Sequence, residues 1–456
     1  MTSPGITAGQ GSHDTIVALA TTPGRSAIAV VRLSGPDAFE IAKHHVRSWP
    51  PEPRLAQLSD IVGADEKLDQ ALVTLFPSPN SFTGEDTVEI STHGGQLVPT
   101  SIVAALTLSG ARQALPGEFT RRAVLNGKLD VLQAEAIGDL IDAGSRAMQK
   151  AALGQLDGGL SNRLADLRRQ LIDLEALLAY DVDFPEEDDG PVASARVENA
   201  VRDVLQSLSA LLATVPMGEL VREGALVVIA GPPNVGKSSL FNALLGRSRA
   251  IVTEIPGTTR DALEAVIDTG KWPIRLVDTA GLRDTDDRLE RLGIQVSEGY
   301  LAAADIVLAC ADDSDLVDRI REAIARQTQA PVVAVRTKAD LVPERDQSER
   351  PDLLWISAVS GIGVPSLIVA IDGIIDERQA FSVDAPMLTS ARHRRAIETA
   401  YAEVRDFEHV WKDQKLPATV ATVHLRTAVV ALEELVGSIE IEDVLDRVFS
   451  SFCVGK

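Results

Sequence analysis

The sequence predicts a multidomain chain in which an α+β domain and a helical bundle accompany an inserted α/β domain. Three observations point to this fold class. The chain has 456 residues, which is enough for about three domains of ordinary size. Long helical leucine patterns follow a mixed strand-and-helix region, and a strand, a glycine-rich turn and a helix interrupt them near residue 230. We expect an N-terminal domain and a helical domain split around the insertion, with the segments 1–125, 126–219, 220–376 (the insertion) and 377–456.

The N-terminal segment contains short apolar runs that are typical of strands. A helix is expected to begin at Ser34-Gly35-Pro36-Asp37, where a proline stands early. The expected strands are Thr15–Ala20, Ala27–Leu33, Ala71–Phe76 and Thr87–Ile90. This pattern predicts an α+β domain and indicates no chemistry by itself.

Helical periodicity runs from Val131 to about Leu212 and returns after the insertion. Leucines alternate by four and three along the first long helix, at Leu160, Leu164, Leu167, Leu171, Leu174 and Leu178. Further helices are expected over 201–212, 397–411, 425–432 and 444–452. Two helical blocks on either side of an insertion are most economically packed into one bundle.

The insertion opens with a phosphate-binding loop in suitable surroundings. The apolar run Ala225–Ile229 predicts a buried strand, Gly231–Ser238 has the G-x-x-x-x-G-K-S pattern, and a helix follows. Backbone N–H groups of such a loop and the helix N-terminus favour bound phosphate. Lys237 is expected to reach the outer phosphates and Ser238 to ligate Mg²⁺. The expected nucleotide contacts are Asn234, Val235, Gly236, Lys237, Ser238 and Ser239.

Three later elements predict which base is bound. One strand ends in the D-x-x-G sequence Asp278-Thr279-Ala280-Gly281, which is expected beside the Mg²⁺ shell and the γ-phosphate. Another leads into Thr337-Lys338-Ala339-Asp340, where the Asp340 carboxylate can accept hydrogen bonds from N1 and the exocyclic amine of guanine. Ser357-Ala358-Val359 is expected to close over the base. In this order behind a phosphate-binding loop, the elements resemble those of a Ras-like GTPase fold.

Thr337 stands where this base-recognition element ordinarily has asparagine. A hydroxyl has one donor and an amide has two, so one tether to the base or to the phosphate-binding loop is expected to be lost. We expect guanine choice to be kept through Asp340, with weaker nucleotide affinity. Titration of Thr337→Asn with labelled GDP tests this, and no gain in affinity refutes it.

The segment Thr253–Asp261 is interpreted as the first switch loop, in which Thr259 is the natural second Mg²⁺ ligand. Leu282 follows the D-x-x-G sequence, where Ras-like enzymes carry a glutamine that orients water. An apolar side chain cannot do this, so the water must be oriented from elsewhere. The candidates are Asp284, Asp286, Asp287 and Glu290.

The motifs G-x-P-N-x-G-K-S, G-T-T-R-D and D-T-A-G-L-R resemble those of potassium-activated GTPases, particularly the tRNA-modification GTPase family called MnmE or TrmE. The resemblance implies a K⁺ ion held by Asn234, Thr253, Ile255 and Thr258. It also implies that Glu290 is catalytic, orienting the attacking water through a bridging water. The switch residues expected to contact GTP are Thr253, Glu254, Ile255, Pro256, Gly257, Thr258 and Thr259.

Segments of the N-terminal domain also resemble this family, among them Asp14–Ala18, Ser81–Asp86, Pro116–Thr120 and Leu125–Asp130. The resemblance implies a domain that binds a tetrahydrofolate derivative, 5-formyl- or methylene-tetrahydrofolate, and forms a homodimer. Its folate-contacting positions match Arg32, Glu89 and Lys128.

The terminal residues Phe452–Lys456 resemble the F-C-I-G-K ending of the family, with valine at the isoleucine position. The resemblance implies a folate contact for Lys456. A catalytic role for Cys453 is left open, and full tRNA modification by Cys453→Ser would remove this residue from the mechanism.

Composition limits the surroundings in which the chain works. The 2 cysteines suit a reducing cytoplasm, and neither a targeting peptide nor an apolar run of membrane-spanning length is expected. The formal net charge of −22 argues against non-specific binding of nucleic acid. A tRNA would therefore dock on local basic clusters, such as Arg121-Arg122 and Arg392–Arg395, or largely on a partner.

The resemblance implies that partner, an FAD-dependent protein like MnmG, which forms a heterotetramer with the dimer. Together they would add a carboxymethylaminomethyl or aminomethyl group to C5 of the wobble uridine of certain tRNAs, with GTP hydrolysis here. Two alternatives stay open at this point. One is a ribosome-assembly GTPase with similar switch sequences, and the other is a folate aminomethyltransferase regulated by its GTPase domain.

Overall fold

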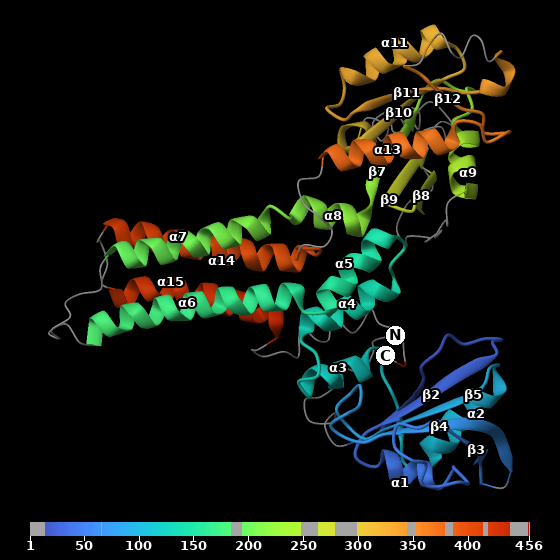
Figure 1. Ribbon diagram of the computed structural model, residues 1–456, viewed down its shortest axis with the longest axis vertical. Coiled ribbons are helices and arrows are strands. Elements are labelled where there is room, and N and C mark those ends of the chain that lie inside the picture. Colours follow the sequence, from blue (N-terminus) through green and yellow to red (C-terminus); the bar gives the residue numbers. More distant parts are fainter. Residues whose placement is uncertain are drawn as a thin grey trace, which may run out of the picture. The chain divides into compact units, whose positions relative to one another are not determined.

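The computed structural model describes residues 14–64, 66–183, 194–247, 263–278, 299–343, 350, 352–378, 386–413, 418–437 and 455. The chain divides into two compact units. The first comprises residues 1–138 and 433–456, and the second comprises residues 139–432. Each unit contains a six-stranded sheet (Figure 1).

The first unit has the sheet order β3-β4-β5-β2-β1-β6, antiparallel except for the pair β1–β6. Its strands are β1 (Ile16–Leu19), β2 (Ile28–Ser34), β3 (Gln57–Val62), β4 (Lys67–Phe76), β5 (Thr87–His93) and β6 (Arg112–Gln113). Its helices are α1 (Ala38–Lys43), α2 (Leu97–Leu108), α3 (Glu118–Leu125) and most of α4 (Val131–Ile141).

Alternate residues of β2 and β5 point to opposite faces of this sheet. Val31, Leu33, Val88 and Ile90 are buried with residues of α1 and α2 in one core cluster. Arg32 and Glu89 lie between these positions, on the opposite face. The predicted strands and the helix after Pro36 are confirmed, whereas β3 and β6 were not predicted.

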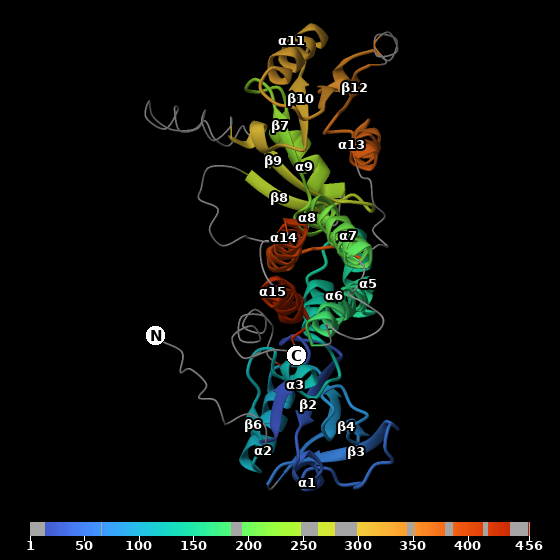
Figure 2. The same cartoon turned by 90° about the vertical axis from the view of Figure 1, so that its left-hand side faces the viewer.

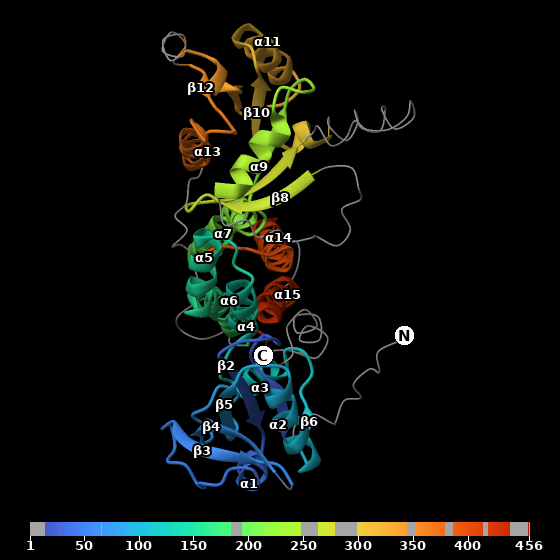
Figure 3. The same ribbon diagram turned by 90° about the vertical axis from the view of Figure 1, so that its right-hand side faces the viewer.

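The second unit contains a four-helix bundle of α6 (Gly159–Asp183), α7 (Ser194–Leu212), α14 (Ala391–Asp413) and α15 (Ala418–Val436). The helices lie side by side, α7 with α14 and α6 with α15 (Figure 1), and Figure 2 and Figure 3 show all four nearly end-on. The predicted leucine seam of α6 is at most 2% exposed at every position. The bundle is therefore confirmed, and the helix expected over 444–452 lies outside the described residues.

Two short helices, α5 (Arg146–Leu156) and α8 (Val215–Glu223), accompany the bundle. Among the described residues, the stretch Ala195–Glu223 is long and apolar enough to cross a membrane, which corrects the expectation that no such run exists. This is weak evidence for a membrane span, because a core helix passes the same test, and α7 packs against α6 and α14.

The inserted domain has the sheet order β12-β11-β10-β7-β9-β8, parallel except for the edge pair β8–β9. Its strands are β7 (Ala225–Ala230), β8 (Leu263–Asp268), β9 (Pro273–Asp278), β10 (Ile306–Ala311), β11 (Val332–Arg336) and β12 (Leu354–Trp355). Its helices are α9 (Lys237–Arg247), α11 (Ser314–Ala325) and α13 (Val364–Arg378), with the 3₁₀ turn η2 (Ala339–Leu341).

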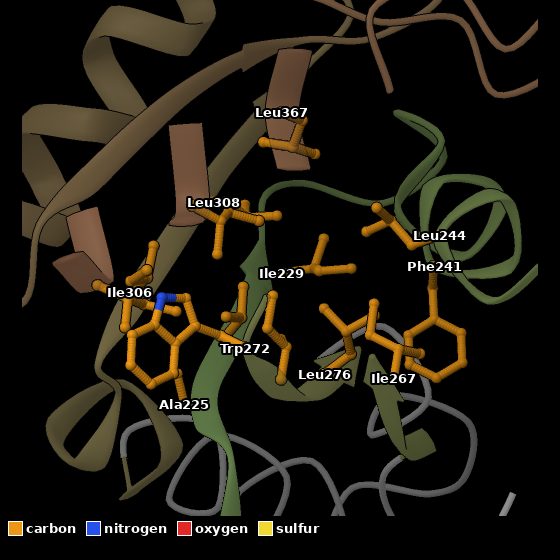
Figure 4. Close-up of a cluster of buried hydrophobic side chains, with 14 of the residues drawn as sticks. Ala225, Ile229, Phe241, Leu244, Ile267, Trp272, Leu276, Ile306, Leu308 and Leu367 are labelled. Atoms are coloured by element: carbon orange, nitrogen blue, oxygen red, sulfur yellow. The ribbon is translucent and has the colours of Figure 1, made fainter. Parts of the chain in front are cut away.

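The central strand β7 is buried along its whole length, as its continuous apolar run predicts. Ala225, Val227 and Ile229 share one face of the sheet with residues of α9 and α13, and Figure 4 shows several of them with Phe241, Leu308 and Leu367. The opposite face packs against α11. Helices on both faces leave the carboxyl edge of the parallel strands accessible, where ligands bind in such sheets.

Candidate nucleotide-binding site

The loop between β7 and α9 has the backbone of a phosphate-binding turn. Gly231, Asn234 and Gly236 have φ values of 154°, 63° and 100°. A Cβ atom on Gly231 would lie 2.1 Å from the carbonyl oxygen of Cys310 in β10, so only glycine fits there. The loop can therefore pass close over the sheet edge and present its N–H groups outward.

The two functional side chains at the start of α9 are held by short contacts. The Lys237 ammonium is buried and donates to the carbonyl oxygen of Pro232 at 2.8 Å. The Ser238 hydroxyl donates to Oδ2 of Asp278 at 2.7 Å. Asp278 ends β9 and is fully buried. The structure thus brings together the cation, hydroxyl and carboxylate that the sequence placed around phosphate and Mg²⁺.

The base-recognition element follows β11 and is tied to the phosphate-binding loop. The Thr337 hydroxyl lies 2.5 Å from the carbonyl oxygen of Val235 and 2.9 Å from that of Ala311. Lys338, with φ 56°, donates to the Asn234 carbonyl oxygen at 3.1 Å. These contacts hold the base-recognition element against the phosphate-binding loop.

Lys338 also forms an ion pair with Asp312 at 2.6 Å. This hydrogen bond lowers the pKa of the Asp312 carboxyl. Asp312 follows β10 and was not predicted as a site residue. No motif marked it, because its role depends on β10 and β11 being neighbours in the sheet.

The third loop lies beside the base-recognition element. The Ala339 N–H donates to the carbonyl oxygen of Ile356 at 3.0 Å, immediately before Ser357. Ser357 is fully buried and bonded across its own loop to Gly361 and Ile362, whereas Val359 is 90% exposed. Asp340 is exposed. A buried anchor with exposed residues beside it suits a loop that closes over a base.

These side chains fit a magnesium-bound nucleoside triphosphate. The glycine turn passes close over the Cys310 carbonyl, and Lys237, Ser238 and Asp278 supply the cation, hydroxyl and carboxylate that phosphate and Mg²⁺ require. The carboxylate of Asp340 matches the N–H-rich edge of guanine. Of the expected contacts, Asn234 and Ser239 are exposed on the loop and on α9, and Ala358 is half-buried.

Several expected site residues lie outside the described residues. They are Thr253, Glu254, Ile255, Pro256, Gly257, Thr258, Thr259, Thr279, Ala280, Gly281, Glu290, Cys453 and Lys456.

The first unit contains the residues expected to bind folate. Arg32 and Glu89 face each other across β2 and β5, and the Arg32 Nε donates to Oε1 of Glu89 at 2.9 Å. The guanidinium carbon lies 5.3 Å from the ring centre of Phe82 and 5.6 Å from that of Phe119. Arg32 is thus paired and stacked, so its direct effect is to position the Glu89 carboxylate.

Lys128 is joined to the loop that carries Phe82. Its ammonium donates to the carbonyl oxygen of Pro79 at 3.0 Å. A Cβ atom on Gly84 would lie 3.3 Å from Lys128 Cγ and 3.1 Å from Asn126 Cβ. The segment 126–128 and the loop 79–84 therefore pack closely together, with Arg32 against the same loop through Phe82.

A network of two arginines and three carboxylates supports this region. Arg122 is 3% exposed and pairs with Asp14 at 2.6 Å, Glu118 at 3.1 Å and Glu85 at 3.2 Å. Arg112 pairs with Asp14 at 2.7 Å and Glu118 at 2.6 Å. Asp14, Glu85 and Glu118 belong to segments that carry the family resemblance, but only the fold shows that they share one buried cation.

The sheet order, the glycine loop after β7 and the base loops after β11 and β12 define a protein of the P-loop GTPase class. Residues 131–453 match the family described as the MnmE helical domain, and residues 15–128 match the GTP-binding protein TrmE N-terminus. The chain belongs to the MnmE (TrmE) family of tRNA modification GTPases.

Curated relatives match over nearly the whole chain. The tRNA modification GTPase MnmE of Heliobacterium modesticaldum is 40% identical over 466 residues, covering 97% of this chain and 99% of the relative. That of Akkermansia muciniphila is 42% identical over 455 residues, with the same coverage. Among solved structures, the G domain of the T. maritima FeoB iron transporter is 26% identical, with 34% of this chain and 99% of that chain covered and a TM-score of 0.26.

Proposed function

We propose that this chain is a GTP hydrolase of tRNA modification that is activated by potassium. The observation that carries the proposal is the joining of three loops at one sheet edge. Ser238 meets Asp278 at 2.7 Å, and Thr337 meets the phosphate-binding loop at Val235 at 2.5 Å. These contacts support one continuous site for the phosphates and the base of a guanine nucleotide, in a chain whose relatives are named tRNA modification GTPases.

In this proposal Lys237 binds the outer phosphates and Asp340 reads guanine. Ser238 and Thr259 would hold Mg²⁺, and Asn234, Thr253, Ile255 and Thr258 would hold K⁺. These cations would supply positive charge where it develops on the transferring phosphoryl group. Glu290 would orient the attacking water, because Leu282 cannot.

The GTPase test compares turnover in KCl and NaCl at equal ionic strength. We expect KCl to raise kcat by roughly 10²-fold, the usual effect of one well-placed transition-state charge. Asn234→Lys should abolish the response to potassium. The matched control is Asn242→Lys, which adds the same charge at an exposed position of α9. Equal rates in both salts, or a wild-type response in Asn234→Lys, would refute potassium activation.

We further propose that the N-terminal domain binds 5-formyl- or methylene-tetrahydrofolate in a cytoplasmic homodimer. Arg32, Glu89 and Lys128, with Lys456, would contact the folate, and Arg32 would act mainly by positioning Glu89. With an FAD-dependent partner like MnmG, in a heterotetramer, the dimer would modify C5 of the wobble uridine. We also propose that the domains meet at residues 125, 219 and 376, the boundaries expected from the sequence.

Calorimetric titration with 5-formyl-tetrahydrofolate tests the folate site. Loss of the Glu89 charge in Glu89→Gln should weaken binding by about tenfold, as expected for a hydrogen bond to a charged group. Glu52→Gln, at an exposed position, is the matched control. Mass spectrometry of wobble nucleosides from a strain without this chain tests the tRNA reaction, and an unchanged nucleoside profile would refute it.

A further inference from the structure

The Thr337 hydroxyl is fully engaged by the protein. Thr337 is 4% exposed and lies between two carbonyl oxygens, those of Val235 and Ala311, at 2.5 and 2.9 Å. Its backbone N–H donates to Ala311 as well, at 2.8 Å. Val235 belongs to the phosphate-binding loop and Ala311 ends β10. Thr337 therefore fastens the base-recognition element to the loop and to the sheet.

This arrangement uses the only hydrogen that the hydroxyl has. A carbonyl oxygen is an acceptor, so contact with either neighbour requires the O–H as donor. N7 of a guanine ring is also an acceptor and can be read only by a donor. An asparagine amide has two N–H hydrogens, and could serve a loop carbonyl and N7 together. A threonine that serves the loop has no hydrogen left for the base.

Two neighbouring donors of the same element are used too, the Ala339 N–H and the Lys338 ammonium. The Ala339 N–H donates to Ile356 at 3.0 Å. The Lys338 ammonium is held by the Asp312 carboxylate at 2.6 Å and the Asn234 carbonyl oxygen at 3.1 Å. By contrast the Asp340 carboxylate is exposed, and its oxygens are acceptors. The element therefore presents an acceptor for the N1 and amine edge of guanine.

We propose that this chain reads guanine through its N1 and amine edge and is blind to N7, because Thr337 is a positioning residue for the phosphate-binding loop. The inference rests on the proposed GTP site and deepens it by stating which edge of the base is recognised. It also states which contact is lost when threonine stands in place of asparagine: the contact to the base is lost, and the contact to the phosphate-binding loop is kept.

The test compares the affinity of the full chain for GDP and for 7-deaza-GDP, in which C–H replaces N7. Competition against a ribose-labelled GDP gives both values. The wild-type chain should bind the two nucleotides within about twofold, since no hydrogen bond is lost. In Thr337→Asn, GDP should bind about fivefold more tightly than 7-deaza-GDP, the effect of one neutral hydrogen bond. Differences in stacking cancel between variants, because both use the same pair of nucleotides.

Two further variants separate the loop contact from the base contact. Thr337→Ser keeps the hydroxyl and should keep the wild-type ratio of affinities near one. Thr337→Val removes the hydroxyl at nearly constant shape and should weaken both nucleotides equally. Several-fold weaker binding of 7-deaza-GDP by the wild-type chain would overturn the inference, even if Thr337→Asn failed to fold.

Inosine diphosphate, which lacks the exocyclic amine, keeps this inference distinct from the proposed function. The wild-type chain should bind it at least about tenfold more weakly than GDP, because Asp340 loses a charged hydrogen bond. No binding of GDP, or equal binding of ADP, would refute the proposed function itself. Binding of GDP with discrimination against 7-deaza-GDP would refute the N7 inference alone.

Discussion

At the scale of the single residue, Gly231 has little freedom to change. Its φ of 154° and the approach of the Cys310 carbonyl leave no space for a side chain. The thiol of Cys310, which lies in β10, is buried, and this burial raises its pKa to about 12. Cys310 is thus an inert part of the floor beneath the loop.

We expect Gly231→Ala to weaken GDP binding by about tenfold or more, since about 1–3 kcal/mol of backbone strain would have to be relieved by moving the loop. Equilibrium titration with labelled GDP measures this. Gly246→Ala is the control, because Gly246 lies in α9 with no atom within 4 Å of a new Cβ. The control should keep its affinity and gain up to about 1 kcal/mol of helix stability. Equal affinities in the two variants would contradict the steric argument.

At the scale of the element, the turn between β8 and β9 is fastened to α13. The Trp272 indole is buried and donates to Asp376 at 2.9 Å. Thr269 donates to Asp372 at 2.8 Å, and Lys271 forms an ion pair with Asp376. The strand that ends at Asp278 beside Ser238 is therefore anchored at its other end by α13.

Asp376→Ala should destabilise the chain by about 1–3 kcal/mol, because the buried indole N–H loses its acceptor. Lys271→Ala removes only the exposed ion-pair partner of the same carboxylate and should cost less than about 1 kcal/mol. Urea unfolding followed by tryptophan fluorescence measures both. A larger effect for Lys271→Ala would show that the ion pair, and not the indole hydrogen bond, holds the turn.

The carboxylates around Arg122 join several elements of the first unit. Burial would raise the pKa of Glu118, but hydrogen bonds from Arg112 and the Leu115 N–H hold it below the ordinary value. Burial would also raise the pKa of Asp14, but hydrogen bonds from Arg112 and Arg122 hold it below the ordinary value. A carboxyl with a lowered folded-state pKa stabilises the fold above its unfolded pKa, and that contribution is lost as the pH falls.

We therefore expect Glu118→Gln to cost about 1–3 kcal/mol at pH 7 and progressively less below about pH 4.3, the ordinary glutamate value. Urea unfolding by circular dichroism from pH 7 to pH 3 gives the difference between variant and wild type. The matched control is Glu52→Gln, at an exposed position, and its difference should stay near zero throughout. A Glu118→Gln cost that is constant with pH would contradict the linkage.

At the scale of the whole molecule, Gly455 and the strand β1, far apart in the sequence, lie in contact within the first unit. Gly455 is buried with a φ of 101°, and a Cβ atom there would lie 2.3 Å from the Leu19 carbonyl oxygen at the end of β1. Residues 433–456 accordingly group with residues 1–138 in the first unit. In the second unit, α8 likewise packs against a distant part of the sequence: a Cβ atom on Gly218 would lie 1.9 Å from the Leu388 carbonyl oxygen.

Gly455→Ala should disrupt the contact of this residue with β1, because neither its φ nor its surroundings accept a side chain. Hydrogen exchange followed by mass spectrometry should show faster exchange in peptides that cover Ile16–Leu19. Gly373→Ala, in α13 with no atom within 4 Å of a new Cβ, is the control. Unchanged protection of β1 would mean that the contact is not maintained in solution.

Much of the fold could be predicted because local patterns carried it. The apolar run of β7, the leucine seam of α6 and the glycine turn each reflect a requirement met within a few residues. β3 was missed because its residues do not follow the usual alternation of a strand: Leu58 is exposed and Ser59 is buried. β6 was missed because two residues carry no period.

The sequence by itself determined the class of site: a glycine loop with Lys237 and Ser238, an aspartate after each of two strands, and a threonine where an amide is usual. Only the tertiary structure decided what Thr337 touches, that Arg32 is committed to Glu89, and that one buried arginine gathers Asp14, Glu85 and Glu118. The physical reason is that motif spacing is fixed by local backbone geometry. The partner of a donor or a charge is instead set by which strands become neighbours, often a hundred residues apart.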